Sequence, residues 1–203
     1  MQQLIHAYFD TLTEVTRNAA VTDKAGHEIG MERGFAIVRD LAHKAHDGDN
    51  KLIFIGNGGS QGMSSHLAID YSKNGGLRSL AFTDASALTC LGNDLGYENV
   101  FAKQIDFHAR RGDLVIATSS SGNSANIING VSAARNRGCH VVTFSGFKDD
   151  NKLRRLGDVN FYVSSLQYGF VEIAHLSLCH AILDIDMGWD PRQPNKQLVA
   201  QGV

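Results

Sequence analysis

The chain has 203 residues, of which 43% are hydrophobic and 20% charged, and its formal net charge is −2. This length is enough for one α/β domain with a sizeable core. Nucleic acid is not an expected partner, because no basic run with interleaved aromatic residues occurs. The apolar runs are too short for a membrane span, and the N-terminus lacks a signal-peptide pattern. The three cysteines are widely spaced, as in a protein of a reducing compartment. We therefore expect a soluble cytoplasmic protein without a membrane partner.

Two amphipathic segments precede the first predicted strand. Apolar residues recur at helical spacing over residues 1–20 and again over about 26–47. Two leading helices are more than one face of a sheet needs. We expect them partly to cover the sheet and partly to contact another subunit.

The central stretch joins a predicted strand to a predicted helix. Residues Lys51–Ile55 form a short apolar run, long enough for a buried strand, and Gly56–Ser60 follow it as a glycine cluster. Ser60 occupies the expected N-cap position of a helix that runs to Lys73. A glycine loop at a helix N-terminus suits a phosphate or a cluster of sugar hydroxyls, although it can also be a purely structural turn. The spacing matches neither the dinucleotide fingerprint nor a Walker A loop, so no nucleotide cofactor is expected.

A second small-residue loop follows a second buried strand. Residues 113–118 predict the strand, Ser119–Ser124 the loop, and about 125–137 a helix that ends at Gly138. The serine hydroxyls and the helix N-terminus suit a phosphate that must be released again, and the alternative is a serine-rich turn. Both loops would lie at the carboxyl edge of one parallel sheet, where ligands bind in such folds.

Strands and helices alternate along the remaining chain. The pattern predicts further strands at 80–82, 140–144 and 159–163, and helices at 85–91, 98–108, 150–156 and 170–187. The last helix is apolar nearly all round and should be buried. This alternation indicates the α/β class, with a doubly wound parallel sheet flanked by helices. We expect a single domain, with leading helices in residues 1–48 and a C-terminal tail in residues 188–203.

Polar residues on two of these helices are candidates for chemistry. His66 and Asp70 stand at positions i and i+4, so they share one helix face as a metal pair, an acid/base pair or a surface contact. The last helix carries Glu172, His175 and His180, and burying such groups is costly unless they are satisfied. We expect His175 to be a satisfied core residue. Glu172 and His180 would lie ~12 Å apart on an ideal helix. They could share one ion only if Glu172 precedes the helix proper or if the site joins subunits.

The combined motifs resemble the sugar isomerase (SIS) domains. The resemblance rests on Gly56–Ser60, His66, Gly92–Asp94, Ser119–Ser124 and the last helix, and it covers nearly all of residues 1–203. More narrowly, the chain is similar to bacterial sedoheptulose-7-phosphate (phosphoheptose) isomerases. That resemblance implies a single SIS domain that interconverts sedoheptulose 7-phosphate and D-glycero-D-manno-heptose 7-phosphate through an enediol, for lipopolysaccharide or capsule heptose. It also implies a cytoplasmic homotetramer with active sites at the subunit interfaces.

The resemblance also assigns roles to individual residues. Asp70 and His180 would be catalytic, and one zinc ion per subunit would be held by His66, Asp70, Glu172 and His180. The residues that would bind the sugar phosphate are Asn57, Gly58, Gly59, Ser60, Asn93, Asp94, Ser119, Ser120, Ser121, Ser124 and Glu172. The family usually has Glu at position 70 and Gln at position 172.

A competing hypothesis is a non-catalytic SIS regulator that binds phosphosugars, or a protein-interaction module. That hypothesis predicts loss of the acid/base and metal residues. Since those residues are chemically competent here, we favour the enzyme.

Overall fold

A six-stranded sheet with the strand order β1-β6-β5-β4-β2-β3 forms the centre of the protein. The computed structural model describes residues 1–198, so the last part of the predicted tail, 199–203, lies outside the described residues. The strands are β1 (Ala20–Asp23), β2 (Leu52–Ile55), β3 (Ser79–Ala81), β4 (Leu114–Ser119), β5 (His140–Ser145) and β6 (Val159–Tyr162). Strands β2 to β6 are parallel, whereas β1 pairs antiparallel with β6.

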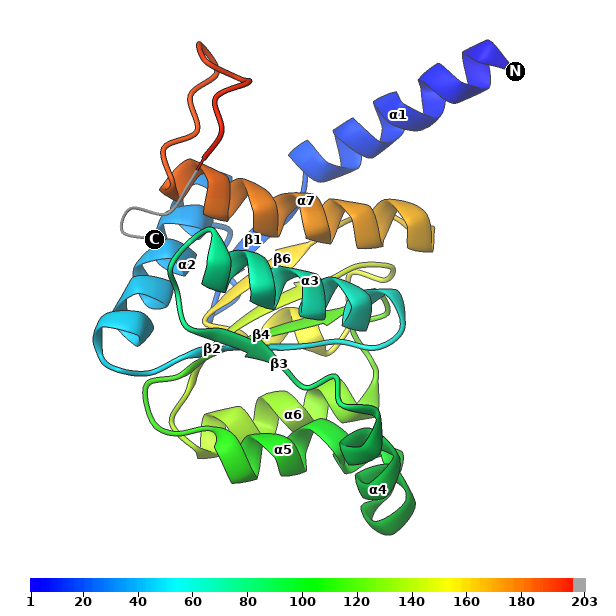
Figure 1. Ribbon diagram of the computed structural model, residues 1–203. Helices are drawn as coiled ribbons and strands as arrows, with labels where there is room; N and C mark the ends of the chain where they lie inside the picture. Colours follow the sequence, from blue (N-terminus) through cyan, green and yellow to red (C-terminus); the bar gives the residue numbers. More distant parts are fainter. Residues whose placement is uncertain (199–203) are drawn as a thin grey trace.

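Helices cover both faces of the sheet, as predicted (Figure 1). One face carries α2 (Met31–Asp47), α3 (Gly59–Lys73) and α7 (Tyr168–Asp186), and the other carries α4 (Ala85–Leu95), α5 (Val100–His108) and α6 (Ala125–Asn136). Successive side chains of a strand point to opposite faces, so β2 serves two cores. Leu52 and Phe54 pack in the first core, and Ile53 and Ile55 pack in the second. The predicted doubly wound α/β fold is confirmed.

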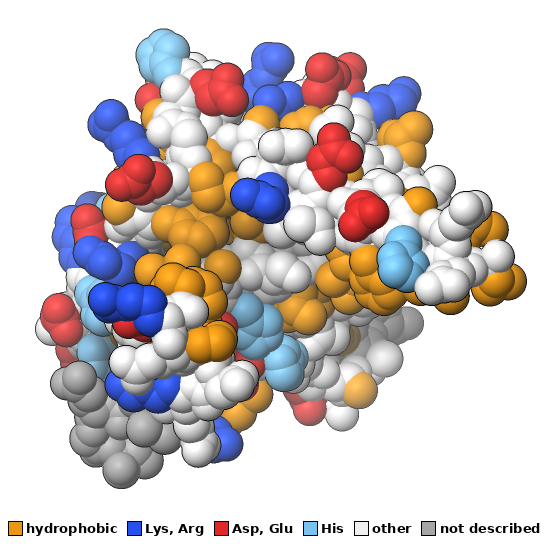
Figure 2. Space-filling model, turned by 90° about the horizontal axis from the view of Figure 1, so that it is seen from above, with side chains coloured by type: hydrophobic (Ala, Val, Ile, Leu, Met, Phe, Trp, Pro, Cys, Tyr) orange, Lys and Arg blue, Asp and Glu red, His pale blue; other side chains and the backbone are white. Residues whose placement is uncertain are grey.

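Helix α1 (Gln2–Arg17) extends away from the body and packs mainly along α7 (Figure 1). The ring of its Tyr8 lies 4.6 Å from that of Phe170 at the start of α7. The apolar face of α1 is otherwise exposed, with Leu4 at 70% and Phe9 at 59%. Figure 2, viewed from the side of α1 and α7, shows hydrophobic side chains gathered on this face.

Helix α7 is only half buried, which corrects our expectation of a fully buried helix. His175 and its neighbours face the sheet, but Ile173 and Ile185 are 44% and 50% exposed. Among residues 1–198, α7 is the one helix long and apolar enough to cross a membrane. One of its faces is buried against the rest of the protein, as in the core helix of a globular domain.

Several predicted boundaries were wrong. A strand, β1, lies between the two leading helices, and α2 starts at Met31 rather than near 26, after Gly30 with φ +74°. Helix α4 continues past Gly92 to Leu95. The predicted helix at 150–156 is a single 3₁₀ turn, Leu153–Arg155, and another 3₁₀ turn, Tyr97–Asn99, precedes α5. The N-cap of α3 is Gly58, so Ser60 lies inside the helix.

Candidate active site

The two small-residue loops meet at the carboxyl edge of the sheet, as the parallel topology predicted. They enclose a cleft of about 350 Å³. The cleft is lined by Asn57, Gly58, Gly59, Ser60, Ser119, Ser120, Ser121, Ser124, Tyr168 and Glu172. Glycine is required at Gly56, because a Cβ there would lie 2.6 Å from the backbone of Ser60. The close turn brings the start of α3 up to the cleft.

The cleft can bind an anion through two helix N-termini. Helices α3 and α6 begin here, with Gly58 and Ser124 as their N-cap residues. Neither N-cap residue accepts a hydrogen bond with its side chain from the N–H groups of the first helical turn. The first N–H groups of a helix have no partner within the helix and attract negative charge. Ser119 Oγ lies 3.5 Å from Ser121 Oγ and 3.3 Å from Ser124 Oγ, so three hydroxyls cluster beside these termini. Among the described lining residues none is a lysine or arginine.

Asn57 is held by two residues that the sequence did not indicate. Its side-chain amide pairs with that of Asn126 through two 2.8 Å hydrogen bonds, one donated by each partner. Tyr97 donates its hydroxyl to Asn57 Oδ1 at 3.1 Å. Asn126 is 2% exposed on α6, so this pair fixes the amide of Asn57 at the edge of the cleft. The one sequence feature that pointed to this contact is that Asn126 stands at the second position of the predicted helix after the serine loop.

A cluster of His66, Asp70 and His180 lies farther along α3, which carries the first two residues, and α7, which carries His180. Asp70 Oδ2 is 3.1 Å from His66 Nε2 and 3.7 Å from His180 Nε2. One ligand atom from each residue lies within 4.8 Å of the others. Imidazole nitrogens and a carboxylate oxygen are typical zinc ligands, and a catalytic zinc uses three protein ligands with a position left open. The donor set therefore fits a divalent metal.

Glu172 lies away from this cluster, in the cleft. Its carboxylate sits beside Gly59, where an added Cβ would lie 2.4 Å from Glu172 Oε2. Because Glu172 is inside α7, the idea that it precedes the helix proper is wrong. Helices α3 and α7 run side by side in the same direction (Figure 1), so Glu172 is level with Gly59, and His180 is level with Asp70.

Three other predicted residues lie outside the cleft and the cluster. Asn93 and Asp94 are exposed on α4 and hydrogen bond to each other at 2.8 Å, without lining the cleft. His175 is 1% exposed and hydrogen bonds to the Ser145 carbonyl at 3.0 Å. Burial lowers the pKa of His175 to about 4, so it is the core histidine that we expected.

The fold and these loops define an SIS domain. The family model for the SIS domain matches residues 8–146, more than half of the chain, and the chain belongs to that family.

Relatives narrow the assignment. The chain is 39% identical to the phosphoheptose isomerase of Aliarcobacter butzleri over 142 residues, which cover 67% of this chain and 75% of the relative. It is 30% identical to that of Escherichia coli O7:K1 over 190 residues, or 91% and 95% of the two chains. The solved structure of the phosphoheptose isomerase GmhA from Neisseria gonorrhoeae superposes with a TM-score of 0.79 at 31% identity, over 91% and 98%. The chain belongs to the phosphoheptose isomerase family.

Proposed function

We propose that this protein, as a single SIS domain, is an aldose–ketose isomerase that converts sedoheptulose 7-phosphate to D-glycero-D-manno-heptose 7-phosphate. The observation that carries this proposal is the pairing of an anion-binding cleft with a separate acid/base cluster, both of which are lined by residues of α3 and α7. The cleft suits the phosphate, and the His66–Asp70–His180 cluster suits proton transfer at the other end of the sugar.

The separation of the two sites supports a long substrate. Glu172 lies in the cleft and His180 in the cluster, and the eight-residue separation between them on α7 corresponds to a distance of about 12 Å along the helix axis. A zigzag of carbon–carbon bonds of about 1.5 Å gives roughly 10 Å from C1 to the phosphorus of an extended heptose 7-phosphate. Side chains that reach inward from both ends close the difference. A pentose phosphate would be about 2.5 Å shorter by the same arithmetic, so the spacing favours the seven-carbon sugar.

In the mechanism, Asp70 transfers a proton between C1 and C2. Its Oδ2 faces both histidines, while Asn74 Nδ2 lies 3.3 Å from Oδ1 and orients the carboxylate. Removing the C–H proton next to the carbonyl gives the cis-enediol, and returning it to the other carbon completes the isomerisation. His180, 31% exposed in its side chain, is placed to move the proton between the two oxygens. A zinc ion held by His66, Asp70 and His180 would supply Lewis-acid polarisation of the carbonyl.

The serine loop holds the phosphate in this proposal. Ser119, Ser121 and Ser124 would donate their hydroxyls, and the N-termini of α3 and α6 would donate backbone N–H groups. Binding through neutral donors is moderate in strength, which suits a product that must leave. Asn57 would contact the sugar hydroxyls.

We further propose that the active form is a cytoplasmic homotetramer with active sites at subunit interfaces. The exposed apolar face of α1 and the outward side of α7, which together include Leu4, Phe9 and Ile173, support an assembly. An interface would also let Asn93, Asp94 or Glu172 of one subunit approach the cluster of another. The free cysteines fit a reducing compartment, and a heptose of lipopolysaccharide or capsule would be the end use.

The test is direct assay of zinc-loaded protein with sedoheptulose 7-phosphate, following formation of the aldose phosphate. We expect turnover, and a loss of ~100-fold or more in Asp70→Asn and in His180→Ala, because each removes a proton-transfer group. His27→Ala, which removes an exposed histidine far from the cluster, is the matched control. Tight binding of the sugar phosphate without turnover would instead indicate a non-catalytic regulator.

A further inference from the structure

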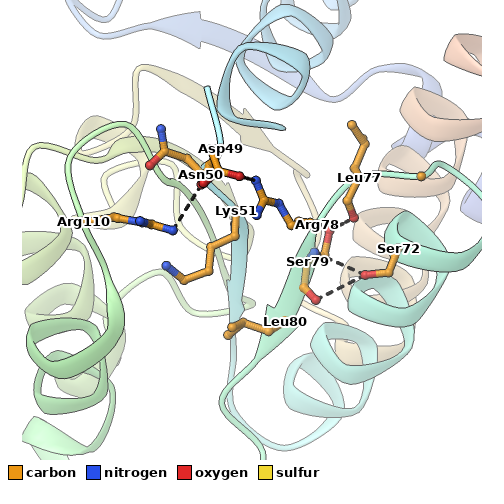
Figure 3. Close-up of a pocket in the computed structure, with 10 residues that line it drawn as sticks. Asp49, Asn50, Lys51, Ser72, Leu77, Arg78, Ser79, Leu80 and Arg110 are labelled. Carbon is orange, nitrogen blue, oxygen red and sulfur yellow. Dashed lines mark hydrogen bonds and ion pairs between the residues drawn. The ribbon is translucent and has the colours of Figure 1, made fainter. Parts of the chain in front are cut away.

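A second hollow lies at the opposite edge of the sheet, where the parallel strands begin. It has a volume of about 360 Å³ and is formed by the residues before β2, the start of β3 and the turn before β4 (Figure 3). Strand β2 connects it to the glycine loop, and Lys51 and Gly56 are separated by roughly 16 Å at 3.3 Å per residue. This hollow is therefore distinct from the candidate active site.

Three cationic side chains line this hollow, although the whole chain carries a net charge of −2. They are opposed by two carboxylates. The Nζ atom of Lys51 is bound to Asp113 at 2.7 Å, and Asp113 is fully buried and also accepts the N–H groups of Lys51 and Arg110. Lys51 is thus committed to Asp113, because separating a buried pair is costly.

The two arginines are available to a ligand. Arg78 pairs with Asp49, whose side chain is 82% exposed, and such a surface pair is weak. Arg110 donates to the main-chain oxygen of Asp49 at 3.2 Å. Figure 3 shows both guanidinium groups directed to residue 49 from opposite sides of the hollow. A phosphate there could accept two hydrogen bonds from each guanidinium, the geometry in which arginine binds phosphate best.

The neighbouring wall of the hollow is apolar and built rigidly. The side chain of Leu80, which is half-buried, faces the hollow, and the adjacent Leu77 is only 3% exposed and anchors this wall in the core. Ser72 Oγ on α3 is hydrogen-bonded at 3.2 Å to both the N–H and the carbonyl of Ser79. A concave site with an apolar wall and a few convergent polar groups is typical of small-molecule binding.

We propose that this hollow binds a small phosphate ester with a planar or apolar organic part, of the size of a nucleoside monophosphate. The phosphate lies between Arg78 and Arg110, and the organic part covers Leu80. The site is independent of the isomerase activity proposed above. Its occupant contacts the last turn of α3 at Ser72, two residues after Asp70.

The experiment is calorimetric titration of the full-length protein with AMP, and separately with inorganic phosphate. Arg110→Gln and Arg78→Gln are compared with Arg111→Gln, which makes the same charge change at an exposed residue that does not line the hollow. A Ser124→Ala variant reports on binding at the serine loop. Thermal unfolding of each variant checks that it is folded.

We expect AMP to bind, with affinity reduced at least tenfold in Arg110→Gln and Arg78→Gln and unchanged in Arg111→Gln and Ser124→Ala. Equal losses in Arg110→Gln and Arg111→Gln would overturn the site, as would loss in Ser124→Ala or no binding at millimolar AMP. Inorganic phosphate that binds as tightly as AMP would overturn the role of the apolar wall. Failure of the isomerase assay would leave each of these results unaffected.

Discussion

The buried amide of Asn126 is expected to control activity through Asn57, although Asn126 does not line the cleft. The two side chains exchange two hydrogen bonds of 2.8 Å. Replacing Asn126 by Ala removes both bonds and leaves only the Tyr97 hydroxyl, at 3.1 Å from Oδ1, among the described partners that orient the Asn57 amide. A net value of ~0.5–1.5 kcal/mol per bond gives about 1–3 kcal/mol, or roughly 5- to 150-fold, as the loss in kcat/KM.

The assay is steady-state kinetics with sedoheptulose 7-phosphate on four proteins: the wild type, Asn126→Ala, Asn57→Ala and the double variant. Because Asn126 acts through Asn57, its replacement should have little further effect on kcat/KM once Asn57 is already Ala. Ser132→Ala is the matched control, since Ser132 lies on the same helix and its exposed hydroxyl donates to the Ile128 carbonyl at 3.0 Å, outside the cleft. Thermal unfolding separates a loss of stability from a loss of positioning.

Two results would refute this reasoning. The first is wild-type kcat/KM in a folded Asn126→Ala protein. The second is full additivity of the two replacements, because independent effects would mean that Asn126 does not position Asn57. An Asn126→Asp protein gives a further check. Its carboxylate can still accept from Asn57 Nδ2 but cannot donate to Asn57 Oδ1, so we expect a loss of activity there as well.

Three other predictions follow from the same structure. Burial lowers the pKa of His175 from 6.5 to about 4, so the unfolded chain binds the extra proton between these values. The free energy of unfolding is therefore highest above pH ~6.5 and decreases as the pH falls, by about 2 kcal/mol at pH ~5. Urea unfolding at several pH values should show this decrease, and it should be much smaller in His175→Gln. Glu172→Gln removes a negative charge from the cleft and should lower KM about tenfold, since a phosphate dianion ~6 Å away is repelled by ~1.4 kcal/mol even with the screening of water; an unchanged KM with weaker zinc binding would contradict this placement. Leu4→Glu with Phe9→Glu should reduce the assembly size in light scattering, whereas Gln3→Glu should not; an unchanged mass would exclude α1 from the interface.

The features predicted correctly from the sequence are those that depend on short stretches of chain. An apolar run followed by small residues specifies a strand and its loop. Helix α4 starts at residue 85, as predicted, where Asp84 caps it by accepting the Ala87 N–H at 2.7 Å. The meeting of the two loops also followed from the sequence, because parallel strands place their carboxyl ends at one edge.

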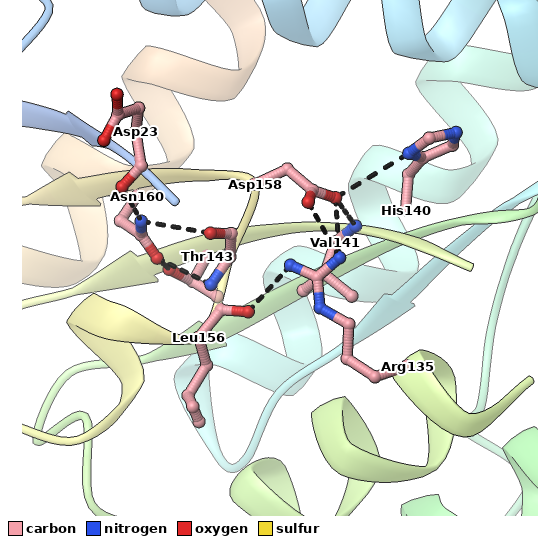
Figure 4. A network of polar contacts seen from close by, with 9 residues as sticks. Asp23, Arg135, His140, Val141, Thr143, Leu156, Asp158 and Asn160 are labelled. Carbon is pink, nitrogen blue, oxygen red and sulfur yellow. Dashed lines mark hydrogen bonds and ion pairs between the residues drawn. The ribbon is translucent and has the colours of Figure 1, made fainter. Parts of the chain in front are cut away.

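Strand β1 shows why other elements could not be predicted. It has four residues, of which only Val21 and Thr22 are β-branched, and its partner β6 is more than 130 residues away. A buried polar network provides what the local sequence lacks (Figure 4). Asn160 on β6 donates to the Asp23 carbonyl at 3.3 Å and accepts from the Thr143 hydroxyl at 2.8 Å, so it ties β1 to the sheet.

An ion pair at the start of β5 belongs to the same network (Figure 4). Arg135 binds both carboxylate oxygens of Asp158 at 2.8 Å, and Asp158 also accepts the Val141 N–H at 2.9 Å. Burial raises the pKa of Asp158, but these hydrogen bonds and charges outweigh it, so the pKa is lowered overall. Such long-range partners leave no local pattern in the sequence.

The candidate site depends on one further relation that the sequence cannot encode locally, the register of α3 against α7. Each helix separately presents plausible ligands, and spacing alone left open whether Glu172 joins His66, Asp70 and His180. In the parallel register, Glu172 is placed against Gly59, where a Cβ would overlap its carboxylate, and His180 is placed against Asp70. The four side chains therefore divide within one chain into a carboxylate facing the phosphate cleft and a three-residue cluster. A carboxylate in the cleft disfavours a bound dianion, so the side chain at position 172 is expected to set the affinity for the sugar phosphate, separately from the proton transfer at the cluster.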